Sequence, residues 1–192
     1  MHFFKWIALS VGIFLLTPAS LHAASAGNDG MHSGMNHGTM GQAQNYNDRA
    51  FLSGMIPHHE AVVAMAKAVW RSGKDPEVKK WATSIMESQE AEIQQMRGWL
   101  KEIGGEDNNA SATMRASMSM MKSSPIDLDP DRNFVAQMVG HHAGAIEMST
   151  AALVHSENGD IIALAKRIID AQSEEIVEFR EWLQRKGNGV RL

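Results

Sequence analysis

The sequence predicts an all-α protein, an antiparallel four-helix bundle built from two repeated helical hairpins. An internal repeat, helix-end signals at matching places and apolar residues spaced three to four positions apart all favour this class. The chain also has one tyrosine and six phenylalanines, which is few for a β-sandwich with an aromatic core. These observations all favour an all-α fold class.

The internal repeat becomes visible when the sequence is shifted by 83 positions. Segment 51–59 then aligns without a gap with segment 134–142, and both contain a Phe, a Met and a His-His pair. Further identities continue through Gln, Glu, Ile, Arg and Trp-Leu to a closing glycine. So many identities at one offset indicate either a duplicated unit or a pseudo-symmetric structure whose two halves stayed alike.

Each half contains the start and stop signals of two helices. We expect a first hairpin at 47–104 and a second at 129–187, forming one domain joined by a methionine-rich connecting segment at 105–128. Asp-Pro and Asn-Gly pairs predict helix starts, and glycines predict helix ends. These signals are Gly73, Asp75-Pro76, Gly104, Asp129-Pro130, Asn158-Gly159 and Gly187.

Two segments precede the repeats. Residues 1–26 resemble a signal peptide, with Lys5, an apolar run too short to span a bilayer, and small residues before a cleavage site after Ala23 or Ala26. An uncleaved membrane anchor is the alternative, and both place the domain outside the cytoplasm. We expect a periplasmic or secreted protein with no membrane attachment after cleavage. Residues 27–46, the tail, have no apolar periodicity and are predicted to be flexible.

Composition excludes several function classes. The formal net charge is −4, so no excess of positive charge points to nucleic acid as a partner. The absence of cysteine excludes disulfides, thiolate metal sites and cysteine nucleophiles. The residues in excess are methionine, with 14 copies, and histidine, with nine, and both are metal ligands.

The His-His pairs border the core face of their helices. On a helical wheel His58 and His59 each lie about 50° from the centre of the apolar stripe, on opposite sides of it. Met55 lies one turn before the pair, about 4.5–6 Å along the axis, so it can share an ion with either ring. Met65 lies about 15 Å from Met55, and it must either meet ligands from another helix or pack in the core. The second repeat has the same pattern at Met138, His141, His142 and Met148.

Thioether sulfur is a soft donor that favours Cu(I), and imidazole accepts Cu(I), Cu(II), zinc and nickel. A mixed Met and His set without cysteine therefore predicts copper, with Cu(I) favoured over Cu(II). The tail adds five such residues within ten positions, which can wrap one ion or simply be disordered. The tail candidates are Met31, His32, Met35, His37 and Met40.

For several other polar and methionine residues, the sequence allows either metal binding or packing in the core. Gln89 and Gln172 interrupt apolar stripes, and each is predicted to hydrogen-bond either a His ring nitrogen or the backbone and a neighbouring Glu. Methionines of helices and of the connecting segment either bind metal or fill space. The glutamates of the second and fourth predicted helices are expected on solvated faces, at positions 87, 90, 92, 174, 175 and 178.

The repeated motif is similar to that of the bacterial domain-of-unknown-function 305 family. The pattern is Phe-x-x-x-Met-x-x-His-His-x-x-x-x-x-Met, followed by Gln-x-x-Glu-Ile-x-x-Met-x-x-Trp-Leu, and it covers about residues 47–187. The resemblance implies a ferritin-like bundle that binds copper, and it places the Met and His residues of both repeats on the family motif. Phe179 stands where the first half has Met96, so the halves need not bind metal equally.

These observations predict an exported protein that sequesters or traffics copper ions and contributes to copper homeostasis. Another periplasmic copper carrier or an efflux component could exchange the metal with it. One alternative is a ferritin-like oxidoreductase of cuproxidase type, although the Glu-x-x-His motif of di-iron bundles does not occur. Another is a structural exported bundle whose histidines bind no metal.

Overall fold

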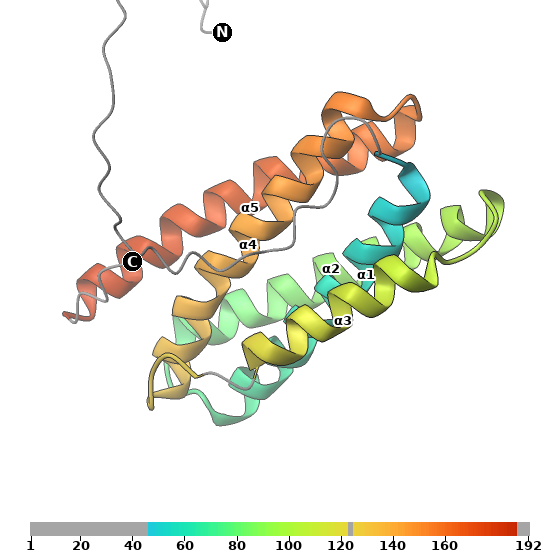
Figure 1. The fold of residues 1–192 in the computed structure, drawn as a ribbon. Helices are drawn as coiled ribbons and strands as arrows, with labels where there is room; N and C mark the ends of the chain where they lie inside the picture. The colour runs from blue at the N-terminus through green and yellow to red at the C-terminus, as the bar shows by residue number, and fades with distance from the viewer. Residues whose placement is uncertain (1–45, 123–124, 188–192) are drawn as a thin grey trace, which may run out of the picture. The chain divides into compact units, whose positions relative to one another are not determined.

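The computed structural model describes residues 46–122 and 125–187, which form helices and short connections (Figure 1). No β-strand occurs in these two ranges, and the predicted all-α class is confirmed. The predicted signal peptide and all of the tail except Tyr46 lie outside the described residues. The helices are α1 (Asp48–Ser72), α2 (Pro76–Glu102), α3 (Asn108–Lys122), α4 (Pro130–His155) and α5 (Gly159–Arg185).

The helix starts follow from local capping chemistry. The side chains of Asn47, Asp75, Asp129 and Asn158 each accept hydrogen bonds from backbone N–H groups in the first turn of the helix that follows. The Asp75 carboxylate, for example, accepts from Glu77 N at 2.8 Å. Proline occupies the first position of α2 and α4, where its missing N–H costs no hydrogen bond.

Four of the helices share one core. α1 packs against α2 as an antiparallel hairpin, α4 packs against α5 in the same way, and α1 also contacts α4. Arg167 on α5 donates to Gln95 on α2 at 2.9 Å, and Arg185 reaches Glu77 at 3.0 Å, so these two helices are also antiparallel neighbours. Each of the two buried apolar clusters draws residues from α1, α2, α4 and α5.

Helix α3 occupies the connecting segment and packs against α1. The sequence analysis expects a methionine-rich connecting segment there and does not include a fifth helix. A start signal is nevertheless present, since the carboxylate of Asp107 accepts from Asn109 N and Ala110 N. Ser53 on α1 accepts from the backbone N–H of Asp107 at 2.8 Å, which anchors the beginning of α3.

Gly73 ends α1 for a tertiary reason. Its φ is −69°, so the left-handed conformation that usually selects glycine at a helix end is not used. Instead, a Cβ at this position would lie 2.2 Å from Oδ1 of Asp131 on α4. The other oxygen of Asp131 accepts from Lys74 N and Asp75 N, so this contact ties α4 to the turn between α1 and α2.

None of the helices in the described part of the chain has the length and apolar character needed to cross a membrane.

Gly73→Ala is expected to lower the free energy of unfolding by about 1–3 kcal/mol, because the added methyl overlaps the Asp131 carboxylate. Urea denaturation followed by circular dichroism measures the change. Gly98→Ala is the matched control, since no atom lies within 4 Å of its Cβ position on α2. That substitution should stabilise by up to about 1 kcal/mol through helix propensity. Equal effects of the two changes would contradict the close-approach explanation.

Candidate metal centre

The two His-His pairs meet where α1 crosses α4. The rings of His58 and His141 have centroids 3.7 Å apart, and both residues are buried. Their chain neighbours, His59 and His142, are fully buried on the opposite side of each helix's core face. Both rings of each pair therefore border the core, as the helical wheel predicts. One ring of each pair faces the other hairpin, and the second ring faces the partner helix of its own hairpin.

His59 and His142 each pair with a glutamate on the other helix of their own hairpin. Nε2 of His59 lies 2.9 Å from Oε2 of Glu92 on α2. Nε2 of His142 lies 2.6 Å from Oε2 of Glu175 on α5. The two pairs occupy equivalent positions in the repeats, and both glutamates are only half-buried. The expectation that these two glutamates belong to solvated faces is wrong, whereas the other four glutamates of that set are exposed.

The glutamates define which ring nitrogen is left for a ligand. A carboxylate accepts hydrogen bonds, so Nε2 of each histidine is the donor to its glutamate. In the neutral imidazole the lone pair is then on Nδ1. Nδ1 of His59 and Nδ1 of His142 are buried, and neither has a hydrogen-bond partner among the described residues. Metal-binding histidines commonly donate their other N–H to a carboxylate, which orients the ring and raises its basicity. Both pairs have this arrangement.

Methionine lies one turn away from each oriented ring. Met55 and Met138 precede the two histidines by four residues and are fully buried. Because Glu92 faces His59 across antiparallel helices, Met96 one turn beyond Glu92 lies opposite Met55. The same register places Phe179 opposite Met138, and the ring of Phe179 lies 5.4 Å from that of His142. The first hairpin can thus offer two thioethers and an imidazole, and the second offers one thioether and an imidazole.

Gln89 and Gln172 do not hold the histidines. The histidine nitrogens that the glutamines were predicted to bond are instead paired with Glu92 and Glu175, one turn further along each helix. No hydrogen bond joins either glutamine to a histidine in the described chain. Their Oε1 atoms are buried without a hydrogen-bond partner within the described ranges. The repeat alignment, which pairs Glu92 with Glu175, was the sequence signal that could have found the correct partners.

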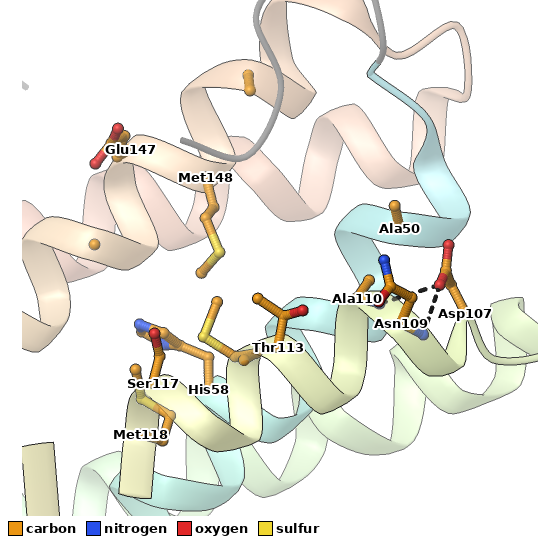
Figure 2. A pocket seen from close by; sticks show the side chains of 13 residues that line it. Ala50, His58, Asp107, Asn109, Ala110, Thr113, Ser117, Met118, Glu147 and Met148 are labelled. Carbon is orange, nitrogen blue, oxygen red and sulfur yellow. Dashed lines mark hydrogen bonds between the residues drawn. The ribbon is translucent and has the colours of Figure 1, made fainter. Parts of the chain in front are cut away.

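Met148 lines a cavity of about 460 Å³ between α1, α3 and α4, and His58 lines the same cavity. Figure 2 shows Met148 extending from α4 into this space, with His58, Ser117 and Met118 on its other side. Met65, the repeat equivalent of Met148, borders a separate cavity of about 270 Å³ whose lining residues include no histidine. Met148 is thus brought together with another predicted site residue, whereas the lining around Met65 provides none.

The remaining predicted ligands are those of the tail. The five Met and His residues predicted in the tail, residues 31–40, lie outside the described residues. In the described ranges no three His, Asp or Glu side chains come together in a metal-binding arrangement. Buried methionines one helical turn from His59 and His142 are the soft donors nearest in sequence to these two rings.

The family model for the domain of unknown function DUF305 matches residues 18–100 and 48–183. The chain belongs to this family. A curated relative, an uncharacterized protein of Acanthamoeba polyphaga mimivirus, is 44% identical over 55 residues, which are 29% of this chain and 36% of that protein. The chain therefore spans about a third of the length of that relative.

Solved structures of family proteins have the same fold. CopM in the Cu(I)-bound form is 27% identical, with a TM-score of 0.62, over 75% of this chain and 100% of that chain. CopM in the apo form is 28% identical, with a TM-score of 0.61, over 74% of this chain and 100% of that chain. A DUF305 protein from Streptomyces coelicolor, at 23% identity and a TM-score of 0.62, shares the fold over 72% of this chain and 92% of its own.

Glu92→Ala should leave Nε2 of His59 buried without an acceptor and lower the free energy of unfolding by about 1–3 kcal/mol. Ring ¹⁵N chemical shifts measure the tautomer directly. They should report Nε2–H for His59 in the unchanged protein and a mixture in the variant. Glu90→Ala is the control. Glu90 lies on α2 two residues before Glu92, and its carboxylate pairs with the exposed Lys67 of α1. An Nδ1–H tautomer in the unchanged protein would contradict the assignment.

Proposed function

We propose that this protein is an exported copper-binding protein that sequesters or traffics copper outside the cytoplasm by stoichiometric binding. One repeated arrangement carries the proposal. His59 and His142 are fully buried, each is oriented by a glutamate through Nε2, and each keeps Nδ1 for a ligand. A fully buried methionine lies one helical turn away from each ring.

The donor atoms favour copper over harder ions. Calcium and magnesium prefer oxygen ligands, whereas a thioether with an imidazole suits Cu(I). Thioether and imidazole are both neutral, so they can bind a monovalent ion in a buried site without an uncompensated ligand charge. The carboxylates of Glu92 and Glu175 remain outside the ligand set and act by orienting the rings. Cu(II) is the secondary candidate, because imidazole also accepts it.

Similarity to CopM supports this choice of metal. CopM structures exist in Cu(I)-bound, Cu(II)-bound and Ag-bound forms, and this chain matches all of CopM in the Cu(I)-bound form. Export rests on the signal-peptide pattern of residues 1–26, and the Met and His residues of the tail are proposed to bind copper as well. A copper carrier or an efflux component outside the cytoplasm is the proposed exchange partner.

The test is an anaerobic Cu(I) titration of residues 27–192 against a chromophoric chelator. Replacing His58, His59, His141 and His142 together by Ala should remove most of the tightly bound copper. Because four buried substitutions can unfold the protein, Met55→Leu combined with Met138→Leu is the second variant. Leucine conserves volume, so the fold should survive while copper affinity falls by about tenfold or more. Met86→Leu, at the edge of the core and outside the His motif, is the control.

A third variant replaces the five tail Met and His residues by serine in the full-length exported chain. Retained copper binding in this variant, with loss in the histidine and methionine variants, supports the bundle sites. Loss only in the tail variant would overturn the proposed bundle sites and make the tail the binding element. An unchanged protein that binds Cu(I) no more tightly than an unrelated methionine-rich helical protein would overturn the copper function itself.

A further inference from the structure

Helix α3 carries methionines that lie outside the duplicated hairpins. Met114 and Met118 are separated by one helical turn, so both point from the same face of α3. That face is turned toward α1 and α4, because both residues line the cavity that Met148 and His58 also line. Met118 is buried, and Met114 is half-buried. Three thioethers from two helices thus converge on one space, which we call the thioether cavity.

Packing alone does not explain this arrangement. Methionine often fills irregular gaps in helical cores, but here the three methionines, with ten other residues, line a cavity of about 460 Å³ that they leave unfilled. The cavity is also open to solvent at its rim, where Asn109, Thr113 and Glu147 are exposed. An exposed methionine-lined hollow leaves apolar surface in water, and a soft ion held by the sulfur atoms would offset that cost.

The equivalent position in the first repeat, beside Met65, borders a smaller cavity with a different lining. Met65 is the repeat equivalent of Met148, yet its cavity is lined by the start of α4 and by no second methionine. The difference arises because α3 packs against α1, which places its two methionines beside Met148 and away from Met65. The two repeats therefore border unlike cavities, and only the one beside Met148 is also lined by the methionines of α3.

We propose that the thioether cavity is a separate binding site for a soft monovalent ion, Cu(I) or Ag(I), with Met114, Met118 and Met148 as ligands. The inference rests on the proposed copper function for the identity of the natural ion. It adds a site in which two of the three ligands, Met114 and Met148, are half-buried, whereas Met55 and Met138 are fully buried. Because the rim of the cavity is exposed, an ion can reach this site without disturbing the core.

The test uses Ag(I) as a diamagnetic probe on the full exported chain with ¹³C-methyl-labelled methionine. Addition of Ag(I) should shift the methyl signals of Met114, Met118 and Met148 together, with about one equivalent needed to complete the change. Met114→Leu combined with Met118→Leu should abolish the shift of Met148 and weaken binding at this site by about tenfold or more. Met148→Leu, on a different helix, should produce the same loss at Met114 and Met118.

Met120→Leu is the matched control, because Met120 lies on the same helix, is exposed and does not line the cavity. Thermal melting of every variant checks that the fold survives, which the conserved side-chain volume favours. If Ag(I) and Cu(I) bind but shift only Met55, Met96 or Met138, this inference is overturned and the proposed function stands. If neither ion binds anywhere, both fail. If the thioether cavity binds Ag(I) and the quadruple histidine variant keeps all of its bound copper, this inference stands and the proposed buried sites fail.

Discussion

The hydrogen bond between a buried histidine and a glutamate of the neighbouring helix is the constraint on which each hairpin depends. A buried imidazole needs a partner for its N–H, and in a poorly solvated interior a carboxylate is the strongest one available. The bond joins one position of α1 to one of α2, so it also sets their antiparallel register. Rotating α2 by one residue would move Glu92 about 100° round the helix and leave His59 without its acceptor.

The contact between the hairpins depends on the same pairs. Adjacent residues on a helix point about 100° apart, so a His-His pair can face a hairpin partner with one ring and the opposite hairpin with the other. His58 and His141 meet in this way at the crossing of α1 and α4, and Gly73 admits Asp131 at the end of α1. Helices α1 and α4 are thus in contact at two separated points along their length.

The two halves repeat one pattern, and single differences distinguish the residues that each half offers. Phe179 in place of Met96 removes one thioether from the second hairpin. Helix α3 covers α1 and supplies sulfur beside Met148 without supplying any beside Met65. The sulfur atoms of the two halves therefore differ in their exposure to solvent within one core. The exposed thioether cavity and the fully buried methionines are the two extremes.

The all-α class and the starts of α2, α4 and α5 were determined by the sequence itself, because the caps Asp75, Asp129 and Asn158 act on the backbone of the next few residues. The placement of both rings of each His pair at the core face was equally local, since it follows from helical periodicity. The partners of those rings were decided by tertiary structure. Choosing Glu92 over Gln89, one turn apart on the same helix, requires the register between two helices. Separating Met148 from Met65 requires the position of α3, and no local pattern contains that information because it arises from packing between distant segments.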